Sequence, residues 1–225
     1  MILDSPIRLL IFDLDGTLID SQVDLANAVN ASRDHLGLPS IANELVFSYV
    51  GNGAPVLIRR ALGPEASQVD VDRALQFFLA YYREHMLDHT TLYPGVREAL
   101  DRLHSSGRKM AVLTNKPVRF SETLIERLEL SEHFQRIYGG NSFPEKKPHP
   151  MGIRTLLTEL NADPKDALMV GDSAVDVRTA RNAGIRACGV TFGFQPETFE
   201  EHPPDFLVDE MGELADIVLA PRVYN

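Results

Sequence analysis

Two aspartates separated by a single residue follow an apolar run near the start of the chain. Residues 9–12 are apolar and lead directly into Asp13 and Asp15, and Gly16 and Thr17 continue the segment. Because a continuous apolar run is typical of a buried parallel strand, both carboxylates are expected at its carboxyl end, where α/β sheets bind ligands. Two unpaired carboxylates crowded there are unstable, and Mg²⁺ suits them because it combines a few carboxylates with phosphate and water oxygens.

An ordinary Asp-Gly turn with both aspartates in solvent is the alternative interpretation, since such turns are common. The whole string, an apolar run and then Asp-x-Asp-Gly-Thr, favours chemistry over a plain turn. The other motifs of the chain distinguish a catalytic site from a solvated turn.

Two more segments place polar side chains near a presumed phosphate. Thr114 and Asn115 follow the apolar residues 110–113, and their side chains suit phosphoryl oxygens, although a helix cap before Pro117 explains them as well. Lys146 and Lys147 stand in a proline-stiffened loop, where a fixed ammonium can neutralise phosphate charge. A solvated loop with surface lysines is the alternative for this segment.

A fourth segment begins at Asp172, which again follows an apolar run, residues 168–170. Ser173 and Asp176 have the spacing of a capping box, so a structural role accounts fully for Asp176. Asp172 has no such explanation, and it therefore predicts a ligand at a second strand end.

These four segments, in this order, resemble the haloacid dehalogenase superfamily of phosphotransferases. The resemblance extends over essentially the whole chain, and residues 49–54 and 141–150 are most similar to its bacterial phosphoglycolate phosphatases. It implies an Mg²⁺-dependent phosphatase that hydrolyses a small phosphate monoester, 2-phosphoglycolate, through an aspartyl phosphate. A sugar-phosphate phosphatase or phosphomutase, or a non-catalytic phosphate-binding regulatory protein, remains the alternative.

The resemblance also implies the role of each motif residue. Asp13 is the implied nucleophile and a metal ligand, and Asp15 is the implied general acid and base, with its backbone carbonyl on the metal. Thr114 and Lys147 complete the implied catalytic set. Asp172 is the implied side-chain ligand of Mg²⁺.

Supporting roles are implied for four further residues. Thr17 and Asn115 are expected to help bind the substrate. Ser173 and Asp176 are expected behind the metal, where Asp176 reaches it through water or holds Lys147.

Strands alternate with helices over most of the chain, which predicts an α/β fold: a doubly wound parallel sheet with helices on both faces. Residues 21–91 interrupt this alternation with helical patterns and no confident strand, and Ser21 with Asp24 is interpreted as the cap of the first helix. We therefore expect a core domain of residues 1–18 and 93–225 and a helical cap domain of residues 19–92. The strands are expected at residues 9–12, 109–113, 136–138, 167–170, 186–190 and 206–208.

The cap is expected to bind the leaving group of the substrate. Its flexible corner, Gly51, Asn52 and Gly53, is one candidate. Because residues 21–91 contain no lysine, Arg59 and Arg60 are the candidates for pairing a glycolate carboxylate, with surface charges as the alternative. The missing lysine also excludes a phosphonatase of this superfamily, which forms a Schiff base with a cap lysine.

Composition limits the partners of the protein. The 225 residues carry a net charge of -10, which argues against nucleic acid and against an anionic membrane surface. The start of the chain does not have the pattern of a signal peptide, and one cysteine, Cys188, allows no internal disulfide. We expect a cytoplasmic monomer or homodimer acting on a small phosphorylated metabolite.

Overall fold

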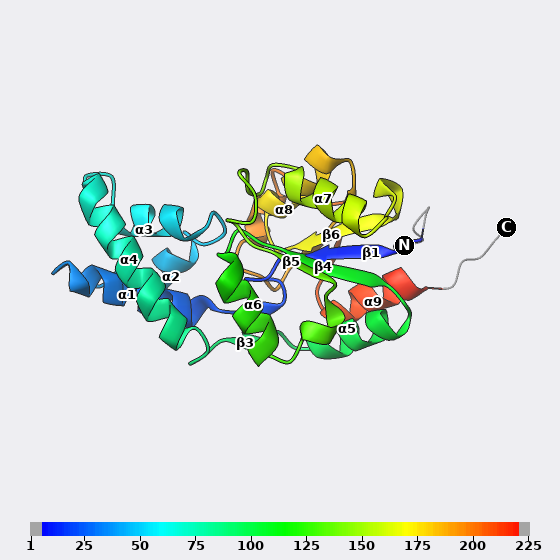
Figure 1. Ribbon diagram of the computed structural model, residues 1–225, viewed down its shortest axis with the longest axis horizontal. Helices are drawn as coiled ribbons and strands as arrows, with labels where there is room; N and C mark the ends of the chain where they lie inside the picture. The colour runs from blue at the N-terminus through cyan, green and yellow to red at the C-terminus, as the bar shows by residue number, and fades with distance from the viewer. Residues whose placement is uncertain (1–5, 221–225) are drawn as a thin grey trace.

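The larger body of the molecule is built on a six-stranded parallel sheet with β1 at its centre (Figure 1). The computed structural model describes residues 6–220, and within them the strand order is β5-β4-β1-β6-β7-β8. The chain builds outward from β1 on one side and then on the other, so the order reverses beside β1. The strands are β1 (Leu9–Phe12), β4 (Lys109–Leu113), β5 (Arg136–Tyr138), β6 (Ala167–Gly171), β7 (Arg186–Val190) and β8 (Phe206–Val208).

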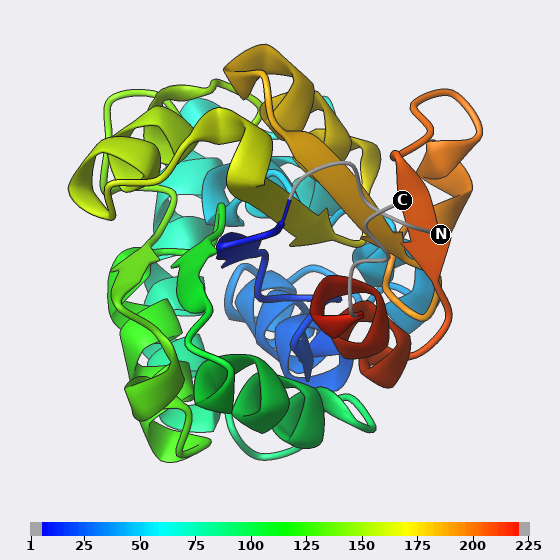
Figure 2. The same ribbon diagram turned by 90° about the vertical axis from the view of Figure 1, so that its right-hand side faces the viewer.

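Helices cover both faces of this sheet, as Figure 2 shows. Because side chains alternate along a strand, Leu10 and Phe12 enter one core while Leu9 and Ile11 enter the other. The first core contains residues of α5 (Val96–Ser105), α6 (Val118–Arg127) and α9 (Met211–Leu219). The second contains residues of α7 (Met151–Glu159) and α8 (Ala174–Ala183). The predicted α/β fold with a doubly wound parallel sheet is confirmed.

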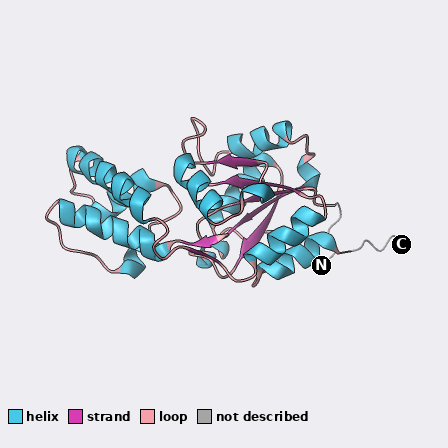
Figure 3. Ribbon diagram, turned by 60° about the horizontal axis from the view of Figure 1, so that its bottom comes forward, coloured by secondary structure: helices cyan, strands magenta, loops and turns pink. Residues whose placement is uncertain are grey.

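Four helices between β1 and β4 form a separate lobe at one end of the molecule (Figures 1 and 3). We call this lobe the cap. Its longest helices, α1 and α4, pack against each other, and the shorter α2 and α3 lie against them. Ala74 and Phe78 of α4 are buried in the cap core. The cap helices are α1 (Gln22–His35), α2 (Asn43–Phe47), α3 (Ala54–Leu62) and α4 (Gln68–His85).

The chain enters and leaves the cap through a short antiparallel ribbon that the sequence did not reveal. Strand β2 (Ile19–Asp20) pairs with β3 (Thr91–Leu92), with Ile19 opposite Leu92. Two-residue strands carry too little pattern to be recognised in a sequence. The ribbon joins the two linkers to each other, so the chain enters and leaves the cap side by side.

The interpretation of Ser21 and Asp24 as a capping pair is wrong. Ser21 precedes α1, but its hydroxyl donates to Asp15 Oδ1 at 2.5 Å instead of capping the helix. The buried Asp24 carboxylate accepts hydrogen bonds from the backbone N–H groups of His89 and Thr90 and from the Thr90 hydroxyl. A tertiary contact to the returning chain therefore replaces the local cap.

Candidate active site

The register of the three central strands brings the predicted site residues together. Phe12 of β1 lies opposite Val112 of β4 and Val170 of β6, so the three strands end at one level. Asp13 continues β1 there, and its N–H donates to the carbonyl of Val170 at 2.9 Å. The strand-end positions expected for Asp13, Thr114 and Asp172 therefore meet at one edge of the sheet.

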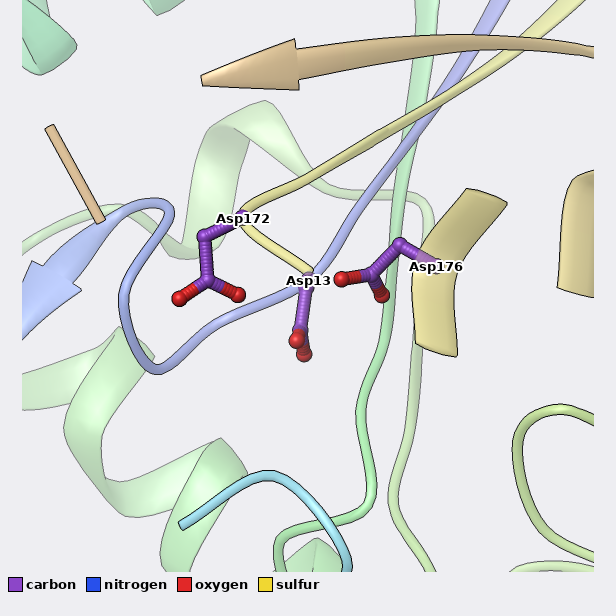
Figure 4. A group of neighbouring side chains, drawn as sticks. All are labelled: Asp13, Asp172 and Asp176. Atoms are coloured by element: carbon purple, nitrogen blue, oxygen red, sulfur yellow. The ribbon is translucent and has the colours of Figure 1, made fainter. Parts of the chain in front are cut away.

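Three buried carboxylates face one another at this edge (Figure 4). One carboxylate oxygen from each of Asp13, Asp172 and Asp176 lies within 4.8 Å of the others. Asp13 and Asp172 leave the ends of neighbouring strands, and Asp176 projects from the first turn of α8. Among the described residues this is the group of acidic side chains that fits a metal ion.

Lys147 supplies the nearest positive charge to this cluster. Its ammonium nitrogen lies 2.9 Å from Asp13 Oδ1 and 2.7 Å from Asp176 Oδ1. Burial alone would lower the pKa of Lys147, but the two carboxylates raise it above its usual range. The Leu14 N–H also donates to Asp13 Oδ1, at 2.7 Å. No hydrogen bond within residues 6–220 is made to Asp13 Oδ2, and this oxygen is available for chemistry.

The carboxylates are short of compensating charge. Burial raises the pKa of Asp13 to about 6; Lys147 opposes the shift and Asp176 adds to it. Burial, followed by Asp176 and Asp13, raises the pKa of Asp172 well above its usual value. Four carboxylates, these three and Asp15, meet two ammonium groups, which leaves two negative charges in excess when all are ionised. A divalent cation fits this donor set.

The second ammonium belongs to Lys116, which the sequence interpretation did not include. Its nitrogen lies 2.9 Å from Asp15 Oδ1, 3.1 Å from Asp15 Oδ2 and 2.8 Å from the hydroxyl oxygen of Tyr82 in α4. Burial alone would lower the pKa of Lys116, but Asp15 and Tyr82 raise it above its usual range. The signal was present, because Lys116 stands two positions after Thr114 in the same strand-end loop.

Thr114 and Asn115 both line the cavity, but their side chains have different partners. Thr114 lines the cavity above Asp13. The Asn115 side chain is taken up by structure: it accepts from the Lys147 N–H at 3.0 Å and donates to the carbonyls of Lys147 and Gly51. Asn115 also lines the cavity, and its side chain positions Lys147 and contacts the cap.

Three further residues of the predicted site, Ser173, Asp176 and Thr17, lie near the end of the sheet. Ser173 and Asp176 form the capping box of α8, with Ser173 Oγ 3.0 Å from Asp176 Oδ2. The same Asp176 carboxylate binds Lys147 through its other oxygen, so it serves the helix and the site together. Thr17 is fully buried, and its hydroxyl has no partner among the described residues. Thr17 does not line the cavity.

A small cavity of about 50 Å³ lies between this edge of the sheet and the cap, with room for a few water molecules. Of the predicted corner, Gly51 and Gly53 line it, whereas Asn52 contributes no lining atoms. Its polar lining comes mainly from the sheet side. Its apolar lining comes from Leu25, Val50, Ala54, Leu57 and Phe78 of the cap and Pro117, Phe120 and Phe194 of the sheet body.

Three side chains of the sheet body hold one edge of the cavity through residues 48–53, which we call the cap loop. Asn115 donates to the Gly51 carbonyl at 2.9 Å, and Lys146 donates to the Asn52 carbonyl at 2.6 Å. Gln195, after β7, donates to the carbonyls of Ser48 and Val50 at 3.3 and 2.9 Å. Each of these contacts ends on the backbone of the cap loop.

The structure does not bring Arg59 and Arg60 to the cavity. Arg59 donates to the Ala66 carbonyl and to the side chain of Gln68, and Arg60 donates to the Tyr49 carbonyl. Both side chains lie on the outer side of α3, where they pair with carbonyls of neighbouring cap segments. The prediction that they meet the leaving group is therefore corrected.

Comparison with known proteins identifies the family. A family model described as haloacid dehalogenase-like hydrolase matches residues 10–190. A Chromobacterium violaceum protein named phosphoglycolate phosphatase is 42% identical over 216 residues, covering 94% of this chain and 96% of the relative. A Vibrio vulnificus protein of the same name is 40% identical over 222 residues, covering 95% and 96%. The chain belongs to the haloacid dehalogenase-like hydrolase family.

Solved structures agree with this family. The crystal structure of a predicted phosphoglycolate phosphatase from Haemophilus somnus 129pt matches with a TM-score of 0.90 at 33% identity. The match covers 95% of this chain and 99% of that one. The family and the enzyme class predicted from the sequence, a phosphoric monoester hydrolase, are confirmed. Within residues 6–220, no helix is long and apolar enough to span a bilayer.

Proposed function

We propose that this enzyme hydrolyses 2-phosphoglycolate through a phosphorylated Asp13. The observation that carries the proposal is the pair of Asp13 oxygens. Lys147 and the Leu14 N–H hold Oδ1, while Oδ2 has no described partner at the floor of the cavity. The small cavity and the names of relatives at 40–42% identity support a two-carbon leaving group.

In the first step, Asp13 Oδ2 attacks phosphorus and the bond from phosphorus to the glycolate oxygen breaks. Asp15 gives its proton to that oxygen, so glycolate leaves as the alcohol. Lys147 stays beside Asp13 and offsets the negative charge of the transferring group. Thr114 lines the same space and is placed to donate a hydrogen bond to a phosphoryl oxygen.

In the second step, water attacks the phosphorus of the aspartyl phosphate. Asp15, now ionised, takes a proton from this water. The bond between phosphorus and Asp13 Oδ2 breaks, and inorganic phosphate leaves with the Asp13 carboxylate restored. The side chain of Asp15 is held for this exchange by Ser21 and Lys116.

Mg²⁺ is the proposed cofactor, and the excess of two negative charges supports it. Asp13 and Asp172 would hold it with their carboxylates and Asp15 with its backbone carbonyl, while Asp176 stands close enough to act directly or through water. When bound, the ion supplies Lewis-acid stabilisation of the phosphoryl oxygens.

Residues 19–92 are the proposed cap domain, which encloses the substrate against a core of residues 1–18 and 93–225. The ribbon attachment and the cap-loop contacts support a lobe that closes over the site. We propose a small phosphorylated metabolite as the partner and the cytoplasm as the compartment.

A phosphate-release assay tests this function. Purified protein is incubated with 2-phosphoglycolate, several sugar phosphates and an aryl phosphate, each with Mg²⁺ and with excess chelator. We expect 2-phosphoglycolate with Mg²⁺ to give the highest kcat/KM of the panel. A clear preference for a sugar phosphate, or transfer of phosphate within a sugar without release, would replace the proposal with the phosphatase or mutase alternative.

A further inference from the structure

We propose that Lys116 and Tyr82 together bind a carboxylate on the leaving group and thereby select the substrate. The inference rests on the proposed function and adds the residues responsible for its specificity. It replaces Arg59 and Arg60, which the structure places outside the cavity.

Lys116 is the one cation among the described residues that line the cavity. Its side chain is 3% exposed, so the ammonium is buried between the cap and the sheet body. Apart from Asp15, its neighbour in this space is an uncharged phenol. An anionic leaving group that enters the cavity has this ammonium as its charge partner.

The position of Lys116 beside Asp15 fits the connectivity of 2-phosphoglycolate. Asp15 has to contact the ester oxygen in order to protonate it, and one methylene separates that oxygen from the substrate carboxylate. Lys116 Nζ lies one hydrogen bond from Asp15, at 2.9 Å. The ammonium therefore stands beside the place where a carboxylate so close to the ester oxygen has to lie.

Tyr82 offers a second donor at the same place. Its hydroxyl oxygen accepts a hydrogen bond from Lys116, and its own proton has no acceptor among the hydrogen bonds of residues 6–220. The Tyr82 ring packs against two other aromatic rings. It is stacked on Phe78 of the cap, with 5.6 Å between ring centroids, and edge-on to Phe120 of α6, with 5.4 Å between centroids. A fixed ring with a free O–H is suited to donate to an incoming carboxylate.

The other walls of the cavity strengthen the selection. Leu25, Val50, Leu57 and Phe194 offer only apolar surface to a leaving group. A buried carboxylate directed at these residues would lose its water without gaining a partner, which is strongly unfavourable. The cavity therefore offers a positively charged partner to the leaving group at Lys116, beside Tyr82, and none at its apolar walls.

The test compares two substrates of equal carbon number, 2-phosphoglycolate and ethyl phosphate, which lacks the carboxylate. The measured quantity is the ratio of their kcat/KM values in the wild type, Lys116→Met and Tyr82→Phe. Lys109→Met is the matched control, because Lys109 begins the strand that Lys116 follows and lies at its opposite end. Circular dichroism verifies that each variant is folded.

We expect Lys116→Met to lower the ratio about 10- to 100-fold and Tyr82→Phe about 3- to 10-fold, as for charged and neutral hydrogen bonds. Lys109→Met should leave the ratio at the wild-type value. Losses on both substrates from a displaced Asp15 cancel in the ratio. The ratio therefore isolates recognition of the carboxylate from damage to the acid.

An unchanged ratio in folded Lys116→Met overturns the inference, as does an equal fall in Lys109→Met. If Lys116→Met does not fold, Tyr82→Phe decides by the same criterion. If the kcat/KM ratio is reduced in Lys116→Met but stays at the wild-type value in Tyr82→Phe, the proposed role of Tyr82 in binding the carboxylate is overturned. Failure of the proposed function is distinct, because the wild type itself would then show no preference for 2-phosphoglycolate.

Discussion

Lys147 and Asp176 form a buried ion pair, with the ammonium nitrogen 2.7 Å from Oδ1 of the carboxylate. The side chains are 1% and 2% exposed, and the same nitrogen also binds Asp13. This one ammonium therefore joins the first turn of α8 to the end of β1. Removing one member of such a network leaves buried charges without compensation.

We expect Lys147→Met to lower the free energy of unfolding by about 3–5 kcal/mol, because two buried carboxylates lose their shared cation. Urea titration at neutral pH measures the change. Lys146→Met is the control from the adjacent position, where the side chain is exposed and contacts a carbonyl of the cap loop. Comparable losses in the two variants would contradict a special role for the buried ammonium.

Metal removal should abolish turnover and also lower thermal stability. Because the site carries excess negative charge, Mg²⁺ should bind the folded state preferentially and raise Tm. Differential scanning fluorimetry with increasing Mg²⁺ measures the shift without reference to activity. In Asp172→Asn the shift should be much smaller at the same Mg²⁺ concentration. A wild-type Tm that changes with neither Mg²⁺ nor chelator would contradict the proposed metal ligands.

Replacing Asp13 and replacing Asp15 should reduce turnover to different extents. Asp13→Asn should eliminate turnover, because an amide cannot form the aspartyl phosphate. Asp15→Asn should slow turnover by about 10²–10⁴-fold, the usual contribution of a positioned acid and base. Mass spectrometry of acid-quenched wild-type protein should find the phosphoryl group on Asp13. Its presence on another residue would contradict the assignment of the nucleophile.

The Asp24 contact predicts a pH-dependent stability. Burial alone would raise the pKa of Asp24, but hydrogen bonds from His89 and Thr90 outweigh it and lower the pKa below the ordinary 3.8. A lowered pKa stabilises the folded state above the ordinary value, and this contribution disappears as pH falls through the folded value. Asp24→Asn should therefore have a lower free energy of unfolding than the wild type at pH 7. This difference in unfolding free energy should become smaller below pH 3.8.

Urea titrations of the wild type and Asp24→Asn at pH 7 and at pH 3 measure this effect. Asp88→Asn is the control, because Asp88 pairs with His85 on the surface of the same end of the cap. A deficit in Asp24→Asn that stays constant down to pH 3 would contradict the link to ionisation of Asp24.

The sheet and its strand-end aspartates could be predicted from the sequence because both follow from local patterns. An apolar run identifies each buried strand, and parallel order then brings Asp13 and Asp172 to one edge without knowledge of any tertiary contact. The capping box of Ser173 and Asp176 is also a local pattern, and the structure contains it. The contact of Asp176 with Lys147, one of the two roles expected for Asp176, is present as well.

The cap could not be predicted as well, because its contacts depend on how the lobe sits on the core. The spacing that suggested Arg59 and Arg60 gives their helix but not which side of α3 faces the cavity. Lys116 stands 101 positions from Asp15 and 34 from Tyr82, so no local pattern joins the three residues. Ser21 and Asp24 matched a cap motif, but Ser21 bonds to Asp15 in the preceding loop and Asp24 to Thr90, 66 positions away.

The contacts between the sheet body and the cap loop end on backbone carbonyls, which every amino acid carries. Asn115, Lys146 and Gln195 therefore bind this loop without contacting the side chains of Ser48, Val50 and Asn52. Gly51 and Gly53 are the exceptions to this freedom, because both have a positive φ that disfavours other residues. Mutation within the loop can change the surface offered to a substrate while the means of docking the lobe stays the same. This separation makes the loop a favourable starting point for natural drift, or laboratory selection, toward new phosphate esters.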